Sequence, residues 1–193
     1  MNLDKDIELV NLCQSGDLSA FDGLVRRHQD RIYRLVYKIL DGSNECDDIA
    51  QEAFLKAYRS IKKFNCQSSF STWLTRIAIN QCISHLKRRR RLRILSFGLF
   101  SEHHQTEPQI LVERNEKREI VCKAINSLPL KQRVVIIMYY FESYGCKEMS
   151  EILKCSVGTV KSRLFYARMS LKNKLEPNLK DDELFENGNG VST

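Results

Sequence analysis

The chain has 193 residues, enough for one large domain or two small ones. Its formal net charge is +7, with −4 in residues 176–193 and +11 in the other 175 residues, which favours a polyanionic partner such as nucleic acid. No apolar run approaches the ~20 residues that span a bilayer, and the N-terminus lacks the apolar core of a signal peptide, so we expect a cytoplasmic protein without membrane insertion.

Apolar residues recur at helical spacing almost throughout the chain, and no stretch alternates as a strand would, so an all-α fold is predicted. The first predicted helix has a side-chain cap at Asp17 or Ser19 and ends at Asp41–Gly42. A break at residues 65–69 precedes the third helix, which leads into Lys87–Arg91. The three helices predicted in this half span about residues 21–39, 47–61 and 71–86.

The helical period is lost over residues 92–109, where Gly98 and Pro108 also occur, and a flexible linker is predicted there. The sequence therefore indicates two small helical domains, at residues 1–91 and 110–175, followed by an acidic disordered tail at residues 176–193. The helices predicted in the second domain span about residues 111–126, 130–141, 147–153 and 157–174.

The end of the second domain has the pattern of a helix-turn-helix. A short amphipathic stretch, Met149–Leu153, is followed by a three-residue break and then by Val157–Lys174, which holds five Lys or Arg and no acid. In a helix-turn-helix the second helix enters the DNA major groove and reads bases near its N-terminus. A solvated surface helix explains the same pattern about equally well, because basic amphipathic faces are common.

Aromatic residues border a polar loop in the first domain, just ahead of a basic helix end. Phe64 and Phe70 flank this loop, and Lys87–Arg91 ends the helix that follows. Aromatic rings beside cations suit unstacked bases, since every base has a π-face and every nucleotide a phosphate. The alternatives are an ordinary capped helix with Trp73 in the core, which we prefer for Trp73 itself, and a solvated basic helix end.

Three acids at the start of the second helix, Asp47, Asp48 and Glu52, have three interpretations. Acids in a first turn stabilise the helix dipole, which explains Asp47 and Asp48. The polar face that also carries Gln51 and Lys56 could dock a protein. A metal-dependent nuclease is the least favoured interpretation, because no histidine or further acidic motif joins them.

The seven cysteines indicate neither a metal centre nor a disulfide framework. Their number is odd and no two are closer than nine positions, which excludes a C-x-x-C knuckle, and His103–His104 has no neighbouring thiol. Reduced, mostly buried thiols are expected. We therefore expect no metal, no cofactor and no catalytic residue, so the protein is predicted not to be an enzyme.

Four motifs occur in an order that resembles one protein family. They are Asp47–Tyr58, Phe70–Asn80, Leu128–Pro129 and Val157–Leu164. Together they resemble an extracytoplasmic-function (ECF) sigma factor of the sigma-70 family, the small two-domain class of bacterial transcription initiation factors. The likeness covers about residues 5–175, and four motifs in order are far more specific than any one alone.

The resemblance implies roles for three groups of residues. The second helix would bind the clamp of the largest subunit of core RNA polymerase through Asp47, Asp48, Gln51, Glu52, Phe54 and Lys56. The aromatic loop and third helix would recognise and melt the minus-ten element through Phe64, Ser69, Phe70, Asn80, Lys87, Arg88 and Arg89. The last helix would read the minus-thirty-five element through Thr159, Lys161, Ser162, Arg163, Phe165, Tyr166 and Arg168, with Arg163 and Arg168 on phosphate or in support of the helix.

The implied function is sequence-specific promoter recognition, promoter melting and transcription initiation, with core RNA polymerase and promoter DNA as partners. Members of the family are often held by an anti-sigma factor, although no residue here indicates one. The chain departs from the family at Gly145–Glu148, where Ser-Tyr-x-Glu is usual and a weaker helix cap is expected, and at Tyr166, where Arg is common. A free-standing helix-turn-helix regulator and a nuclease are the rival functions.

Overall fold

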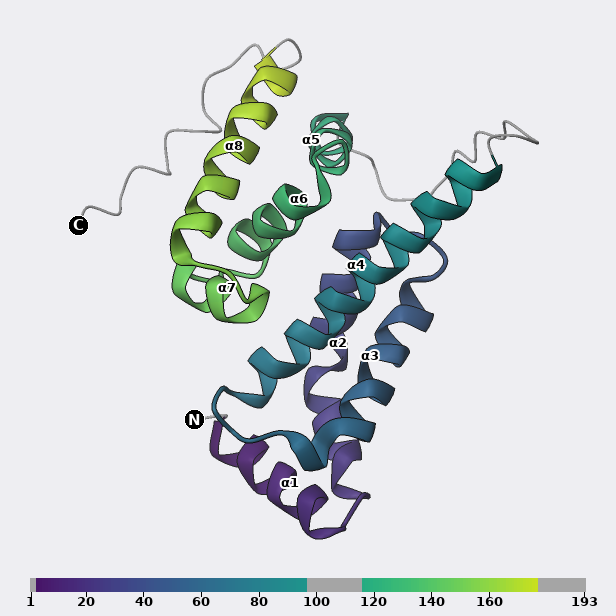
Figure 1. The fold of residues 1–193 in the computed structure, drawn as a ribbon, viewed down its shortest axis with the longest axis vertical. Helices are drawn as coiled ribbons and strands as arrows, with labels where there is room; N and C mark the ends of the chain where they lie inside the picture. Colours follow the sequence, from purple (N-terminus) through teal and green to yellow (C-terminus); the bar gives the residue numbers. More distant parts are fainter. Residues whose placement is uncertain (1–2, 97–115, 177–193) are drawn as a thin grey trace.

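The computed structural model describes residues 3–96 and 116–176, and these residues form two helical modules without a strand among them (Figure 1). We call residues 3–96 the first module and residues 116–176 the second module. The first module consists of α1 (Leu3–Ser15), α2 (Ala20–Leu40), α3 (Cys46–Ser60), the 3₁₀ turn η1 (Ile61–Lys63) and α4 (Phe70–Ser96). The second consists of α5 (Glu116–Asn126), α6 (Leu130–Ile136), the π-helix η2 (Ile137–Phe141), α7 (Cys146–Leu153) and α8 (Val157–Leu175). The predicted all-α fold is confirmed.

Most predicted helices have the expected bounds, and α1 and α4 are the exceptions. Helix α1 was not predicted, and α4 continues to Ser96 through the basic run and the first residues of the predicted linker. The rest of that linker, the predicted helical residues 111–115 and the tail from residue 177 onward lie outside the described residues. The limits of the two domains therefore stay predictions.

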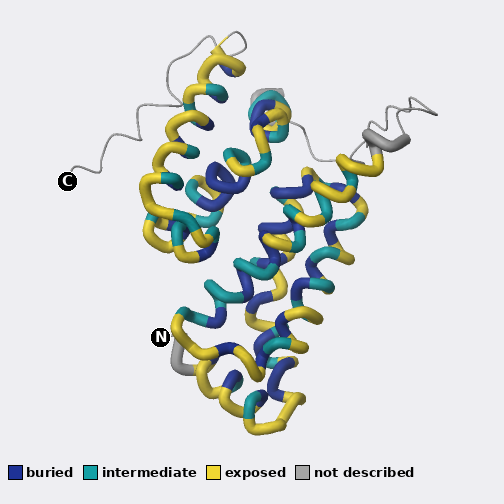
Figure 2. The backbone as a smooth tube through the Cα atoms, in the orientation of Figure 1, coloured by how far each residue is buried: buried dark blue, intermediate teal, exposed yellow. Residues whose placement is uncertain are grey.

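Apolar stripes on the helices meet in the interior of each module, as the dark blue segments of Figure 2 show. In the first module α2, α3 and α4 pack together, and Leu24, Ile39 and Leu74 are fully buried between them. In the second module α8 packs on α5, α6 and α7, and Val160 and Met149 are fully buried there. Periodic burial, rather than intrinsic propensity, supplies most of the stability of such helices.

Helix α2 ends as expected but starts without its predicted side-chain cap. Asp41 adopts the left-handed conformation with φ 58°, and Gly42 follows with φ 65°. A Cβ atom on Gly42 would lie 2.9 Å from the hydroxyl of Tyr37, so this position favours glycine on both counts. At the other end Ser19 occupies the cap position but makes no side-chain cap bond, because its hydroxyl donates to Asp17 instead. The prediction that Asp17 or Ser19 caps α2 with its side chain is wrong for Ser19.

Partly buried polar contacts attach helix α1 to the rest of the first module. Gln14 Nε2 donates to the backbone oxygens of Ile61 and Phe64, at 3.0 and 2.7 Å. At the other end of α1 the carboxylate of Asp6 accepts from Arg27 Nε at 2.7 Å and lies 2.8 Å from Nε2 of His28. Since these bonds join residues distant in sequence, α1 is an integral part of the first module.

The cysteines are less uniformly buried than predicted. Cys13, Cys46 and Cys82 are buried, Cys66 and Cys122 are exposed, and the other two are half-buried, all as free thiols. Burial raises the pKa of the Cys82 thiol to about 12, so this group is not a nucleophile at neutral pH.

The Asp6–His28 pair gives the first module a pH dependence that a His28→Gln substitution should reduce. Burial lowers the pKa of His28 below 6.5, although Asp6 opposes the shift, so the unfolded chain takes up a proton before the folded chain does. The stabilisation that neutral His28 contributes to the folded state is fully present above pH 6.5. It is lost as the pH falls through the lower pKa that His28 has in the folded chain. We expect urea unfolding at several pH values to show that the free energy of unfolding decreases more steeply with falling pH in the wild type than in H28Q. The difference in slope should be at most about 1.4 kcal/mol per pH unit. Equal slopes would contradict the neutral, buried state of His28.

Candidate nucleic-acid and protein interfaces

Helices α7 and α8 form the predicted helix-turn-helix, and the connection between them has well-defined backbone geometry. Lys154 ends α7 in the left-handed conformation with φ 49°, and Ser156 then begins α8 from an extended conformation. The Ser156 hydroxyl accepts from the backbone N–H of Thr159 at 3.1 Å, which satisfies one of the free donors of the first turn. The turn therefore fixes the direction in which α8 leaves the module.

The N-terminal half of α8 presents one exposed face. Lys161 and Ser162 are exposed, and 61% of Phe165 and 54% of Tyr166 are exposed as well. The Ser162 hydroxyl donates to the Gly158 carbonyl at 2.9 Å, so its oxygen keeps free acceptor capacity. The rings of Phe165 and Tyr166 lie 5.5 Å apart, and a contiguous exposed apolar patch of this kind marks a surface that meets a partner.

Thr159 and the two predicted arginines of α8 contact their own module in this structure. Thr159 is half-buried, with its hydroxyl 2.9 Å from that of Ser156. Arg163 is half-buried and its Nη1 lies 3.7 Å from the Cys155 sulfur. The guanidinium of Arg168 lies 5.2 Å from the ring centre of Tyr139 and 5.5 Å from that of its neighbour Tyr140, which are cation–π distances. Of the two roles expected for these arginines, the contacts favour support of the helix.

Helix α7 starts with half of a capping box. The backbone N–H of Gly145 donates to Oε2 of Glu148 at 2.9 Å. The reciprocal bond needs a side chain at the cap position, which glycine does not have. The expectation of a weaker cap at this helix agrees with the geometry.

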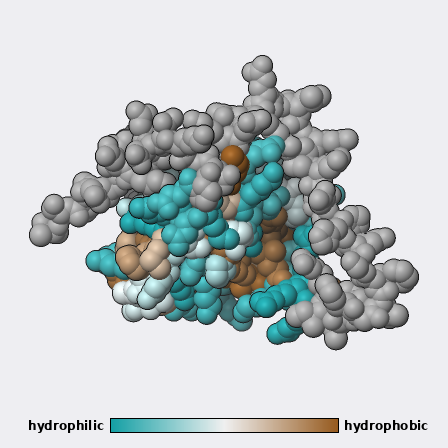
Figure 3. All heavy atoms as spheres, turned by 90° about the horizontal axis from the view of Figure 1, so that it is seen from above, coloured by the Kyte–Doolittle hydropathy of each residue, from teal (hydrophilic) through white to brown (hydrophobic). Residues whose placement is uncertain are grey.

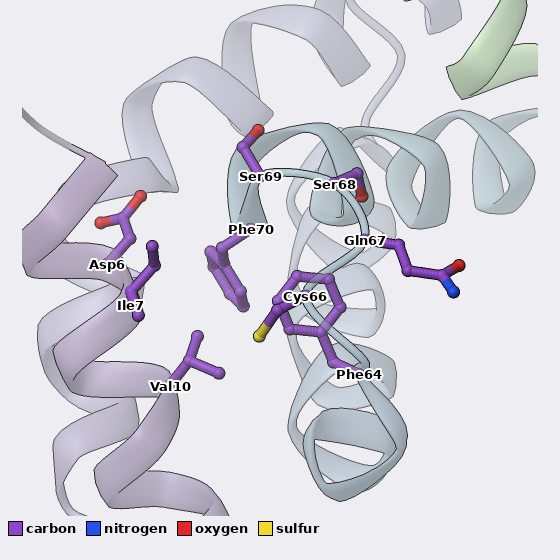
Figure 4. Close-up of a pocket in the computed structure, with 9 residues that line it drawn as sticks. All are labelled: Asp6, Ile7, Val10, Phe64, Cys66, Gln67, Ser68, Ser69 and Phe70. Carbon is purple, nitrogen blue, oxygen red and sulfur yellow. The ribbon is translucent and has the colours of Figure 1, made fainter.

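A cavity of about 290 Å³ lies between α1 and the loop before α4 (Figure 4). The rings of Phe64 and Phe70 and the side chain of Val10 form its apolar side, while the loop contributes polar groups. The amide of Gln67 points away from the rings in Figure 4. The full set of lining residues is Asp6, Ile7, Val10, Phe64, Cys66, Gln67, Ser68, Ser69 and Phe70.

Phe64 and Phe70, which the sequence suggested as partners for unstacked bases, are buried in this structure. Only 6% of Phe64 and 3% of Phe70 is exposed, because both rings pack with Trp73, whose ring centre lies 4.8 Å from that of Phe64. Ser69 caps α4, since its hydroxyl accepts from the backbone N–H of Thr72 at 3.0 Å. The two phenylalanines are therefore walls of a cavity, and stacking on their faces would require the cluster to open.

The remaining residues predicted for the melted strand lie along α4. Asn80, Lys87 and Arg88 are exposed and Arg89 is half-buried. Asn80 and Lys87 are seven residues apart, so they lie on the same side of the helix and about 10 Å apart along its axis. Because α4 remains helical through this run, it holds the cations at fixed positions along its axis, near the end of the helix that is distant from the loop.

The face of α3 predicted to bind a protein is accessible and contains an apolar residue that was not predicted. Asp47, Asp48, Gln51 and Lys56 are exposed, and Glu52 and Phe54 are half-buried. Leu55 lies among them with 47% of its surface exposed, and Tyr33 and Tyr37 of α2 are each 40% exposed. Helices α2 and α3 pack directly against each other. Burial raises the pKa of Tyr33, and the nearby charge of Asp47 contributes to the shift. Leu55 lies four residues after Gln51 and therefore on the same side of the helix, so the sequence could have assigned it to the predicted docking face.

Two negative findings concern the described residues. Among them, no group of three or more His, Cys, Asp or Glu side chains is placed to hold a metal ion. None of the helices within residues 3–96 and 116–176 is long and apolar enough to cross a membrane.

Seen from above, the described atoms are predominantly hydrophilic, and hydrophobic atoms occupy smaller areas (Figure 3).

Comparisons with known proteins agree with this arrangement of two modules. Residues 24–92 match the family profile of Sigma-70 region 2, and residues 118–171 match that of Sigma-70, region 4. The chain is 35% identical to the RNA polymerase sigma-H factor of Pseudomonas aeruginosa, over 92% of this chain and 97% of that protein. It is 36% identical to the ECF RNA polymerase sigma-E factor of Escherichia coli K12, over 89% of this chain and 95% of that protein. The fold is also similar to that of the sigma factor RpoE of Bartonella quintana, solved in complex with the anti-sigma factor NepR, with a TM-score of 0.65 at 24% identity over 82% of this chain and 98% of that one.

Proposed function

Because this chain belongs to the extracytoplasmic-function sigma factors of the sigma-70 family, we propose that it binds core RNA polymerase in the cytoplasm and directs it to a set of promoters. It acts there as an initiation factor and not as an enzyme. The observation that carries this proposal is the exposed face of α8, where cationic, hydroxyl and aromatic groups project from the N-terminal half of a helix-turn-helix recognition helix.

The second module reads the duplex of the minus-thirty-five element. Lys161, Ser162, Phe165 and Tyr166 are the base-reading residues that we propose, since all four are exposed on the N-terminal half of α8. Lysine and serine side chains contact base edges and phosphates, and aromatic rings contact thymine methyl groups. Thr159, Arg163 and Arg168 then hold the helix and its turn in place.

The first module receives the melted strand at the minus-ten element. We place one unpaired base in or beside the cavity, where Ser68 and Ser69 offer polar groups next to apolar walls. Phe64 and Phe70 support that site, and Asn80, Lys87, Arg88 and Arg89 contact the strand along α4. This assignment gives the two phenylalanines an indirect role, in place of the stacking that the sequence suggested.

Energetics indicate that a large partner is needed for melting. Unstacking duplex DNA costs about 1.4 kcal/mol per step, so four steps cost roughly 5–6 kcal/mol. One base held by an aromatic site returns about 1–3 kcal/mol. The chain alone therefore does not hold a bubble open, and core polymerase supplies the difference through the surface formed by α2 and α3. An anti-sigma factor as a further partner stays a prediction.

Run-off transcription from a promoter library, with core polymerase in the presence and absence of this chain, tests the proposal. We expect a defined set of transcripts that depends on the chain. A gel shift with the purified chain alone distinguishes a sigma factor from a free-standing helix-turn-helix regulator. Such a regulator binds its operator with nanomolar affinity in the absence of polymerase. Cleavage of a plasmid with Mg²⁺ that is lost in Asp48→Ala would support the nuclease instead.

The double variant Lys87→Ala/Arg88→Ala should weaken binding to single-stranded DNA and reduce its salt dependence. Each phosphate contact contributes about 0.7 to the slope of log K against log salt, so loss of both should lower the slope by about 1.4. Fluorescence anisotropy of a labelled oligonucleotide at several salt concentrations measures this slope. The matched control is Arg26→Ala/Arg34→Ala, which removes two exposed cations from α2. An equal loss of slope in both variants would mean that the basic end of α4 is not a strand-binding site.

A further inference from the structure

The outer side of α8 has an apolar patch that continues past the residues proposed to read bases. The exposed rings of Phe165 and Tyr166 are followed one helical turn later by Met169, which lies on the same side with 49% of its surface exposed. We call these three residues the apolar face of α8. Methionine is common on surfaces that accept more than one partner, so this face suits a second ligand besides DNA.

Positive charge accompanies this apolar face. Helix α8 contains five Lys or Arg and no acid. Lys161 is exposed and lies four residues before Phe165, so the two side chains are neighbours on one side of the helix. A second ligand for this surface therefore needs apolar groups flanked by negative charge.

The sequence that follows α8 has this composition. Residues 177–193 come after the last described residue, and among them Asp181–Glu186 reads Asp-Asp-Glu-Leu-Phe-Glu. Four carboxylates flank the apolar pair Leu184 and Phe185, and these six residues include no Lys or Arg. We call residues 181–186 the acidic segment. Its charge and its apolar pair complement the surface of α8.

The acidic segment is close enough along the chain to reach the apolar face. Phe165 lies ten residues before Leu175, the end of α8, which is about 15 Å along the helix axis. Phe185 lies ten residues after Leu175, and an extended chain of that length spans about 33 Å. Pro177 cannot continue the helix, which favours a change of chain direction there. The chain is therefore long enough to reverse and place the acidic segment antiparallel to α8.

We propose that the apolar face of α8 binds the acidic segment of the same chain, and that duplex DNA must displace this segment. Leu184 and Phe185 cover the apolar face, and a carboxylate of the segment lies near Lys161. The segment then presents negative charge where the DNA backbone would otherwise lie. The competition with DNA rests on the function proposed above, whereas the contact itself does not.

Tethering makes a weak contact sufficient. Segments joined by short linkers meet their sites at effective concentrations in the millimolar range. A dissociation constant of about 0.25 mM for the separate segment would then close about four fifths of the chains. Because only the open fraction binds DNA, the apparent affinity for DNA decreases about fivefold. The contact therefore reduces non-specific DNA binding by the free chain.

Removal of the apolar pair tests the contact. Leu184→Ser/Phe185→Ser changes no charge, and the matched control Leu179→Ser/Val191→Ser also replaces two apolar residues after α8 but leaves the acidic segment intact. Carbodiimide joins a lysine amine to an adjacent carboxylate, so a cross-link between Lys161 and the acidic segment reports the contact in the full-length chain. Mass spectrometry of the monomeric product quantifies the cross-link, and circular dichroism confirms that each variant is folded.

We expect the Lys161 cross-link in the wild type and in the control, and its yield should decrease at least about fivefold in L184S/F185S. An excess of duplex DNA should also remove it. A labelled duplex of mixed sequence, at about 0.1 M salt, should bind about fivefold more tightly to L184S/F185S than to the wild type or the control.

Equal cross-link yields in the wild type and L184S/F185S overturn the contact. A cross-link found only in dimers overturns it in favour of a second copy of the chain. Loss of the cross-link without tighter DNA binding overturns the competition. Failure of the wild type in run-off transcription would refute the proposed function and leave the cross-link result intact.

Discussion

Lys161→Glu is expected to abolish promoter-specific transcription while binding to core RNA polymerase is retained. Lys161 is exposed in the second turn of α8, where a recognition helix meets base edges and phosphates. Loss of one base contact costs about 1–3 kcal/mol, and the introduced carboxylate adds repulsion from the DNA, so we expect a decrease of at least about tenfold. Run-off transcription measures the first property, and co-elution with core polymerase on a sizing column measures the second.

The control for this prediction is Lys172→Glu, on the same helix. Lys172 lies about 16 Å farther along the axis and pairs with Glu176 at 3.6 Å, with 65% of its side chain exposed. It undergoes the same charge change, so a general electrostatic effect would reduce transcription in both variants alike. Loss of polymerase binding in K161E would show that the second module does not have the role assigned to it.

Leu55→Asp should weaken binding to core RNA polymerase about 10- to 100-fold. Leu55, with 47% of its surface exposed among the polar residues of α3, is an apolar side chain that the proposed docking face would bury against its partner. Burying a leucine fully contributes about 1.5–3 kcal/mol, and placing a carboxylate in the same contact adds a desolvation cost. Titration of fluorescently labelled core polymerase with the chain gives the affinity.

The matched control is Leu12→Asp, since Leu12 of α1 is 46% exposed. Both substitutions are at exposed positions, and both should change the free energy of unfolding by no more than about 0.5 kcal/mol. Equal affinities of L55D and L12D for polymerase would remove the α3 face from the docking surface.

The periodic part of the fold was predictable because it depends on burial of one helix face. Helices α2, α3, α7 and α8 each repeat apolar residues at helical spacing, and the left-handed residues at the end of α2 coincide with Asp41–Gly42. Helix α1 has the same spacing at its buried Val10 and Cys13, but hydrogen bonds and an ion pair that no sequence pattern reveals also attach it to the module. The continuation of α4 was missed because the basic run has no apolar period, although a helix needs none where it is solvated.

The site was predictable where exposure follows from local pattern and not where it depends on tertiary packing. Lys161 and Phe165 lie on the outer face of α8, as their spacing from buried Val160 and Leu164 requires. Phe64 beside cations looks the same in sequence whether it faces solvent or packs on Trp73, so only the structure distinguished these cases. The contact of Glu142 with Lys38 joins residues 104 positions apart, which no local pattern encodes.

The bonds from Gln14 to the backbone of Ile61 and Phe64 give the N-terminal helix an influence on a site that lies far along the chain. The Sigma-70 region 2 profile begins at residue 24, so a fragment cut to that limit would lack one wall of the cavity and the two hydrogen bonds that hold the backbone before the loop. If the cavity receives the unpaired base as we propose, substitutions between residues 3 and 15 alter the choice of base without changing any residue of the matched region.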